Sequence, residues 1–348
     1  ILGATLAGMG PDGVLTLPVA DIMNYAFRGA IQDIQDFEGF DEVCKEFAGS
    51  SLTPFQHGGK TYGLPETEIY QMLFYRKDIF QDLGLKVPET WDDVYSILGD
   101  IQKRNMQFGI TPGIQTLSMF LYQNGAALYS ADKKSVALDT KAAMEQFKKF
   151  TDLFIIFSQP MEFDFSNRFR TGEMPIGIAP YDMSNKLSVF APEINGLWDM
   201  LPIPGTQTAD GIDRSQLNTV TGFAMMEKAR DKDASFQFLK WWASADVQYR
   251  YGREQESLMG SAARYPTANT TAFQKMSWQK SQLEAIQQQR EDVIGLEEVP
   301  GGYYLSRNMD FALRRVILQG EDPREALLEI CDVINEEITQ KYKEFQLD

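Results

Sequence analysis

The stretch that decides the fold lies near the start of the chain, at residues 59–80, which read GKTYGLPETEIYQMLFYRKDIF. Gly63-Leu64-Pro65 is predicted to end a strand, and Glu66, Thr67 and Glu68 follow it directly. In open α/β sheets ligands bind beyond the carboxyl ends of the strands, so these three residues are candidate ligand contacts, with Glu66 the strongest. The alternative is a pair of solvated loop acids, because acidic residues are abundant in this chain.

Beyond this stretch, predicted helices and strands alternate. Residues 88–93, Pro-Glu-Thr-Trp-Asp-Asp, predict a helix start with Thr90 as N-cap and Asp93 at N3. A short strand is expected at 12–17, after the apolar end of a helix at 2–9. The other predicted elements are a helix over 140–157, strands at 176–180 and 220–225, one helical face over 238–249, and a long closing helix after Pro323. This alternation without a long linker predicts an α/β architecture.

Length and charge restrict the function. The 348 residues, 43% of them hydrophobic, exceed the usual span of one compact domain and predict two lobes. The 33 basic and 49 acidic residues give a net charge of −16, which disfavours nucleic acid as a partner. No apolar run approaches the roughly 20 residues that span a bilayer.

Few residues are available for metal or nucleophile chemistry. Cys44 and Cys331 are the two cysteines, and we expect two buried thiols. A single histidine, His57, makes histidine-based zinc sites and Ser-His-Asp triads hard to assemble. We therefore expect no metal and no organic cofactor, although acidic loops leave calcium conceivable.

Residues 59–80, followed by Leu-Gly-Leu at 83–85 and Pro-Glu-Thr-Trp at 88–91, resemble the hallmark of family 1 extracellular solute-binding proteins. Segments 10–14, 170–178 and 202–205 resemble further segments of that family, in the same order. Within the family, 167–175 and 299–304 resemble a subgroup of large binding proteins from Gram-positive bacteria whose binding module is C-terminal.

The resemblance implies a two-lobe, type II periplasmic-binding-protein-like fold with a hinge and a cleft between the lobes. Lobe 1 is expected to comprise 1–76 and 222–262, and lobe 2 is expected to comprise 77–221 and 263–348. The three crossings are expected near 75–78, 219–223 and 260–265. The family usually places a strand, a helix and a second strand before the segment matched by 10–14, so lobe 1 is expected to begin upstream of Ile1 or to replace those elements.

The function implied by the resemblance is that of the extracellular substrate-binding component of an ABC importer, a non-enzyme that closes on a carbohydrate, with an oligosaccharide favoured. The expected partners are the importer's permease subunits, with the protein a monomer anchored at the Gram-positive cell surface through an upstream segment. A sugar sensor for a membrane kinase is one alternative. A glycoside hydrolase or lyase using Glu162, Asp164 or Glu173 is another, because glycoside hydrolysis needs two acids across the scissile bond.

Candidate ligand contacts combine aromatic faces for sugar C–H groups with planar polar groups for hydroxyls. Tyr181 follows the strand at 176–180 and is the leading candidate for a stacking ring, with Asp182 and Asn185 beside it. The alternative is a strand-end tyrosine that anchors a loop. The other candidates are Tyr303 and Tyr304 after Pro300-Gly-Gly, Trp198, and Met259 and Arg264 on either side of Gly260. For each of them a packing role is the competing interpretation.

Overall fold

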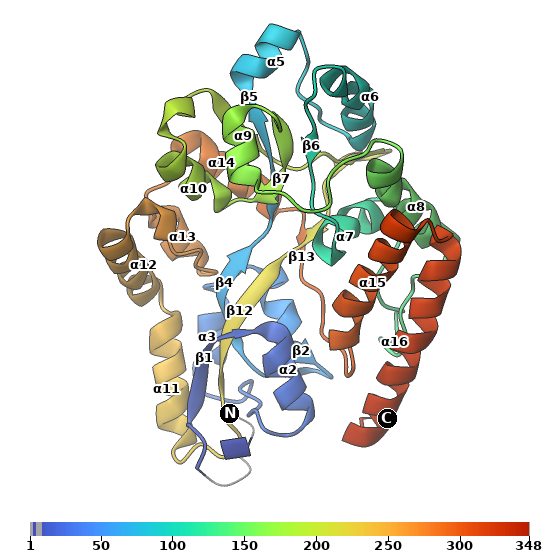
Figure 1. The fold of residues 1–348 in the computed structure, drawn as a ribbon. Helices are drawn as coiled ribbons and strands as arrows, with labels where there is room; N and C mark the ends of the chain where they lie inside the picture. Colours follow the sequence, from blue (N-terminus) through green and yellow to red (C-terminus); the bar gives the residue numbers. More distant parts are fainter. Residues whose placement is uncertain (1–2, 5–8, 348) are drawn as a thin grey trace.

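The computed structural model describes residues 3–4 and 9–347. Two sheets organise these residues, and Figure 1 shows them one above the other. The first sheet is antiparallel with the order β1-β12-β4, whose bounds are Gly13–Pro18, Thr219–Met225 and Leu64–Ile69. The second sheet has the order β6-β7-β5-β8, whose bounds are Phe108–Gly109, Ile176–Pro180, Gln71–Arg76 and Trp198–Leu201.

Helices cover both faces of the first sheet, because its strands alternate between two cores. In β12, Val220 packs in a core with α2 (Val19–Phe27), whereas Phe223 packs in a core with α11 (Lys232–Ala243). Successive side chains of a strand point to opposite faces, so one strand supplies both cores. We call this body the first lobe.

The second sheet is covered in the same way and forms the second lobe. In β5, Leu73 belongs to one core and Phe74 to another. The helices that contribute to the Leu73 core are α5 (Lys77–Leu83), α6 (Trp91–Gln102), α7 (Ile114–Tyr122), α8 (Lys141–Ile155), α15 (Tyr303–Gln319) and α16 (Pro323–Phe345). Those that contribute to the Phe74 core are α9 (Phe165–Thr171), α10 (Met183–Phe190), α13 (Thr270–Lys275) and α14 (Lys280–Arg290). The predicted α/β architecture is confirmed.

The chain passes between the two sheets three times. It leaves the first sheet at Tyr70, between β4 and β5, and returns at Asn218, between β11 (Gln216–Leu217) and β12. The third passage lies between Ala268, in a first-lobe core, and Phe273, in a second-lobe core. The first two passages lie upstream of the predicted crossings at 75–78 and 219–223, and the third lies downstream of 260–265.

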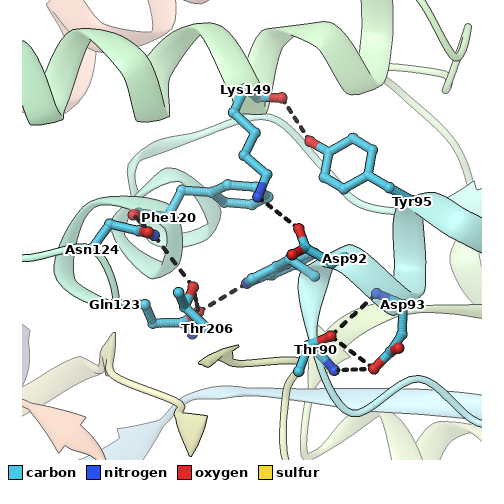
Figure 2. A network of polar contacts seen from close by, with 10 residues as sticks. Thr90, Asp92, Asp93, Tyr95, Phe120, Gln123, Asn124, Lys149 and Thr206 are labelled. Atoms are coloured by element: carbon cyan, nitrogen blue, oxygen red, sulfur yellow. Dashed lines mark hydrogen bonds and ion pairs between the residues drawn. The ribbon is translucent and has the colours of Figure 1, made fainter. Parts of the chain in front are cut away.

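The predicted start of α6 is confirmed. Thr90 accepts a hydrogen bond from the Asp93 backbone N–H at 3.2 Å, and its own N–H donates to the Asp93 carboxylate at 2.9 Å, as Figure 2 shows. This reciprocal capping box satisfies two N–H groups that the helix leaves free. In the same network Tyr95 donates to the backbone oxygen of Lys149 at 2.7 Å, which ties α6 to α8.

Most other predicted elements are present, with one correction. β1, α8, β7, β12 and α16 match the strands and helices expected from the sequence. The single helical face over 238–249 is wrong, because the helix breaks at Ser244, whose φ of −63° and ψ of 146° are extended. The expected helix end at 2–9 falls largely outside the described residues. Of the two thiols, Cys331 is buried and Cys44 is half-buried.

The remaining elements are short or peripheral. The helices are α3 (Phe40–Cys44), α4 (Gly49–Leu52) and α12 (Ala245–Met259), with 3-10 turns η1 (Thr53–Phe55), η2 (Pro192–Ile194) and η3 (Ser261–Ala263). The strands are β2 (Gln56–His57), β3 (Lys60–Thr61), β9 (Thr206–Thr208), β10 (Gly211–Asp213) and β13 (Val293–Ile294).

Candidate functional site

Two adjoining pockets share part of their lining, and one is lined by both lobes whereas the other is lined by the second lobe alone. The first, which we call the hinge pocket, has a volume of about 320 Å³ and contains Asn218 of the second passage. It is lined from both lobes, by Pro18, Val19, Ala20, Pro54, Ile114, Gln115, Tyr129, Leu217, Asn218, Thr219, Val220, Leu296, Glu298, Gly302, Tyr303, Leu305 and Ser306. A second pocket of about 580 Å³, the outer pocket, shares Ile114, Gln115 and Ser306 with it. The two pockets together form a cleft whose volume suits a small organic molecule.

Three helices begin at the hinge pocket. α2 begins at Val19 in the first lobe, whereas α7 begins at Ile114 and α15 at Tyr303 in the second lobe. None of the three has a side-chain cap. The first N–H groups of a helix have no partner within the helix and carry a partial positive charge. The pocket wall therefore offers backbone hydrogen-bond donors from both lobes.

A carboxyl group and a phenol supply side-chain polarity in the hinge pocket. Glu298 is half-buried and is the one acid or base among the residues that line this pocket. Burial raises the pKa of its carboxyl to about 7. Tyr129 is 5% exposed, and burial, aided by the nearby charge of Glu298, raises the pKa of its hydroxyl well above its usual range.

The outer pocket carries more charge. Asp164 caps α9, because its carboxylate accepts from the Ser166 hydroxyl at 2.7 Å and from the Asn167 N–H at 3.1 Å, and these bonds lower its pKa. Lys186 and Asp310 also line this pocket, and burial raises the pKa of Asp310. The cleft as a whole therefore combines acceptors, backbone donors and one ammonium group, an arrangement suited to a polyhydroxylated molecule.

Comparison with known protein families identifies the family of this chain. Residues 1–284 match the model of a family described as bacterial extracellular solute-binding protein. The chain belongs to this family. The resemblance predicted from residues 59–80 is thereby confirmed.

Solved structures share the fold of this solute-binding protein across nearly its whole length. The sugar-binding protein MalE of Xanthomonas citri is 17% identical with a TM-score of 0.83, over 100% of this chain and 88% of that one. The GacH receptor of Streptomyces glaucescens, solved without ligand and with acarbose, is 18% identical with a TM-score of 0.75, over 97% and 86%. A solute-binding protein of Thermotoga lettingae bound to α-D-tagatose is 18% identical with a TM-score of 0.74, over 97% and 88%. The predicted two-lobe, type II fold is confirmed.

The curated relatives match a smaller share of the chain than the solved structures do. A putative binding protein of Brucella abortus (strain 2308) is 24% identical over 249 residues, which are 67% of this chain and 59% of the relative. The solute-binding protein thus spans 59% of the length of that relative. The multiple sugar-binding protein of Streptococcus mutans is 40% identical over 45 residues, 13% of this chain and 11% of that protein.

Tyr181, the leading sequence candidate, does not face the cleft of this solute-binding protein. Its side chain is wholly buried, and its hydroxyl donates to the backbone oxygen of Glu68. Its ring packs edge-on against Tyr70, Phe273 and Trp278, with centroids 5.2 to 5.9 Å apart. This burial corrects the prediction of a stacking platform, because no face of the ring is open to a sugar.

The two candidate acids after Gly63-Leu64-Pro65 are also interior. Glu66 is 2% exposed and accepts from the Thr16 N–H at 2.6 Å and from the Trp242 indole at 3.2 Å. Glu68 is wholly buried at the first passage and accepts from the Asn218 amide at 2.8 Å. Both are corrected from ligand contacts to structural groups, because both side chains are buried and accept hydrogen bonds from the protein.

Their neighbour Thr67 is structural too. Its hydroxyl pairs with that of Thr221 on β12 at 2.6 Å, and it forms an isolated bridge with Thr267. Thr67 lines neither of the two pockets.

The candidates near the third passage lie outside the hinge pocket and the outer pocket. Arg264 donates to Asn185 at 3.0 Å and to Glu256 at 2.9 Å, and it lies over the Trp278 ring at 4.8 Å. Asp182 is half-buried, and burial raises its pKa. Met259 is exposed at the end of α12. These four candidates line neither pocket, and their contact with a ligand stays a prediction.

Tyr303 alone among the predicted contacts lines the cleft, and it is 44% exposed. Its neighbour Tyr304 packs against the second-lobe core. Trp198 is 7% exposed and lies against Phe74, with centroids 5.8 Å apart, so its packing interpretation holds. Of the acids considered for hydrolysis, Glu162 pairs with an arginine in the structure, as does Glu173.

Sequence reasoning missed Gln115, Glu298 and Ser306. A signal was present for Gln115, because Thr111-Pro-Gly is a turn before a helix, and helix starts at strand ends commonly face ligands. No local signal distinguishes Glu298 from the adjacent Glu297, because their different surroundings come from distant segments.

A pocket of about 560 Å³ is lined only by the first lobe, at β1, β12 and α11, so movement of one lobe against the other does not enclose it. Among residues 3–4 and 9–347, no group of three or more His, Cys, Asp or Glu side chains is arranged to hold a metal ion. Within the same residues, no helix is both long enough and apolar enough to span a bilayer.

Proposed function

We propose that this chain is the substrate-binding component of an ABC importer and that it closes its two lobes around a carbohydrate in the cleft. The observation that carries the proposal is the hinge pocket, which is lined by both lobes and lies at the second passage between them. A ligand that contacts both walls binds the closed arrangement more tightly than an open one, so it shifts the population towards closure.

Carbohydrate is the ligand class that the cleft and the neighbours support together. The Xanthomonas protein is a sugar-binding protein, the Streptomyces receptor was solved with acarbose, and the Thermotoga protein was solved with tagatose. The backbone donors at Val19 and Ile114 and the acceptor at Glu298 complement hydroxyl groups, which both accept and donate.

The remaining parts of the proposal follow the family. Binding without turnover is proposed, since the family and the structural neighbours are binding proteins. We further propose a monomer that meets the importer's permease subunits and that is held at the Gram-positive cell surface by an upstream anchor. The hinge is proposed to lie at Tyr70, Asn218 and the segment between Ala268 and Phe273.

A thermal-shift screen with mono- and oligosaccharides tests the function, followed by calorimetry on any sugar that raises Tm. Ser306 is exposed and lines both pockets, so Ser306→Trp should fill the cleft and abolish binding without unfolding the protein. Leu318→Trp is the matched control, because Leu318 is 65% exposed on the same helix and lines neither pocket. Equal binding by both variants would place the ligand elsewhere.

Closure and the absence of turnover are measured on the same complex. Small-angle scattering should report a smaller radius of gyration when the sugar is saturating. Product analysis after prolonged incubation should recover the sugar unchanged, and its cleavage would favour a hydrolase or lyase instead.

A further inference from the structure

The carboxyl of Glu298 is open to the hinge pocket. It lies between β13 and α15 and lines the hinge pocket. Within residues 3–4 and 9–347, no side chain or backbone N–H donates a hydrogen bond to it, and no Lys, Arg or His lies within ion-pair distance. Glu66 and Glu68, the other enclosed glutamates, both have donors from the protein.

Tyr129 adds a second polar group without a partner to the same wall. It is 5% exposed, and it is fixed by a bridge to Val136 and by contact with the start of α15, where a Cβ on Gly302 would lie 2.8 Å from its hydroxyl. In the part of the chain that the structure describes, nothing hydrogen-bonds to that hydroxyl. Glycine at 302 therefore allows the phenol to reach the pocket.

A polar group that faces a pocket bonds to whatever fills it, and a ligand that displaces water there must replace the hydrogen bonds of that water. Glu298 and Tyr129 are two such groups on one pocket wall, so a molecule with matching polar groups is favoured there. A carboxylate only accepts hydrogen bonds, while the helix starts at Val19 and Ile114 only donate them. Hydroxyl groups satisfy both kinds of partner, whereas a carboxylate on the ligand would be repelled by Glu298.

We propose that Glu298, with Tyr129 beside it, is the specificity-determining residue of the cleft: its carboxylate accepts hydrogen bonds from hydroxyls of a neutral sugar or polyol and excludes solutes that carry a carboxylate there. This inference rests on the proposed function and names the class of carbohydrate. It concerns the hinge pocket alone, since the outer pocket has an ammonium group at Lys186.

Ligand affinity at Glu298 should depend on pH. The titratable groups around Glu298 are Tyr129, Tyr303 on α15, and Glu297, which is paired with His57 at 3.3 Å. Because burial holds the pKa of Glu298 at about 7, the free protein carries a proton there in slightly acidic solution. A ligand that donates hydrogen bonds favours the ionised form, so it should bind more tightly as pH rises from 6 to 8, by roughly tenfold.

Calorimetry at pH 6 and pH 8 with named probes tests the inference. The neutral probes are ribitol and maltose, and their anionic counterparts are ribonate and maltobionate. Wild type should bind at least one neutral probe and prefer it over its anionic counterpart. Glu298→Gln should weaken neutral binding by roughly tenfold or more at pH 8, remove the pH dependence and reduce the discrimination against the anion.

Glu297→Gln is the control, because Glu297 neighbours Glu298 in sequence but lines neither pocket. It should retain affinity, pH dependence and discrimination. If Glu298→Gln binds the neutral probe as wild type does, with the same pH dependence, the inference is overturned while the proposed function stands. If wild type binds none of the neutral probes at either pH, both are overturned.

Discussion

Two glutamates, Glu68 and Glu298, differ in the surroundings of their carboxyl groups, because Glu68 is wholly buried whereas Glu298 is half-buried in a pocket wall. Glu68 belongs to what we call the crossing cluster, which consists of Glu68, Tyr70, Tyr181, Asn218 and Arg290. There the Asn218 amide donates to Glu68, and Arg290 lies 3.6 Å from its carboxylate. Glu298, in the hinge pocket, has neither kind of partner among the described residues.

The two regions have different roles: the crossing cluster holds the fold together, whereas the hinge pocket is open to a ligand. In the crossing cluster the partners come from the protein itself: Asn218 donates to the Glu68 carboxylate, and Arg290 forms an ion pair with it, while Glu68 Oε2 and the Nε and one Nη of Arg290 are buried without a hydrogen bond. These contacts hold two passages of the chain together. In the hinge pocket the protein leaves donors and acceptors open on one wall, which stabilises nothing until a ligand arrives. Asn218 belongs to both regions, since it lines the hinge pocket and bonds to Glu68.

The largest expected effect comes from removing a ring of the crossing cluster. Tyr181→Ala should lower the free energy of unfolding by about 3–5 kcal/mol, because it empties a wholly buried site and removes the hydroxyl that bonds to Glu68. Urea denaturation measures the change. Tyr303→Ala is the comparison, because its ring is 44% exposed in the cleft, and it should cost much less. An unchanged midpoint for Tyr181→Ala would break the assignment of this ring to the core.

Removing the cation of the crossing cluster should cost nearly as much. Arg290→Met leaves Glu68 buried without its ion pair and loses the contact over the Phe273 ring at 4.6 Å. We expect a loss of about 3 kcal/mol, measured by urea denaturation at neutral pH. Lys280→Met on the same helix removes an exposed pair with Glu284 and should change stability by less than about 1 kcal/mol. Equal losses of stability for Arg290→Met and Lys280→Met would show that burial of an ion pair does not determine its contribution.

Removing the charge in the hinge pocket should raise the free energy of unfolding instead of lowering it. The folded protein raises the pKa of Glu298 to about 7 from the usual 4.5, so it binds this proton more tightly than the unfolded chain does. That contribution to stability is present below about pH 4.5 and is lost as pH rises through 7. Glu298→Gln should therefore stabilise the ligand-free protein at pH 8 by about 1–3 kcal/mol, and the gain should shrink towards pH 4.5. Destabilisation at pH 8 would mean that the protein itself pairs this carboxylate.

The smallest effect is expected from the adjacent glutamate. Glu297 pairs with His57 near the surface, with 29% of the Glu297 side chain exposed. Solvent screens such pairs, so Glu297→Gln should change the free energy of unfolding by less than about 1 kcal/mol at pH 6. Thermal unfolding of Glu297→Gln and Glu298→Gln under the same conditions measures how much the stability effects of these adjacent residues differ. A larger loss for Glu297→Gln would indicate that the His57 contact couples the lobes more strongly than its exposure suggests.

Much of the fold could be predicted from short segments. The Thr90 to Asp93 spacing predicted the start of α6, and Pro323 predicted the start of α16, because caps and helix starts depend on neighbouring residues. The break at Ser244 was not predicted, since apolar residues continue at helical spacing across it. The crossings were displaced because sheet membership depends on which distant strands pair.

The candidate site was predicted far less well than the fold. The position of Tyr181 at a strand end suggested a cleft, but Phe273 and Trp278, far along the chain, close over its ring. Tyr303 lines the hinge pocket at the start of α15, after a glycine turn, and its contact with a ligand stays a prediction.

The sequence by itself determined the family, the alternation of helices and strands and the individual helix starts, because each of these depends on residues close together in the chain. Only the tertiary structure decided which polar residues are paired and which face the cleft. Glu66, Glu68 and Glu298 are the same side chain, and what distinguishes them is the set of donors that distant segments bring to each. Electrostatic and hydrogen-bonding energies depend on distance in space, so the chemistry of this cleft is fixed by packing rather than by sequence position.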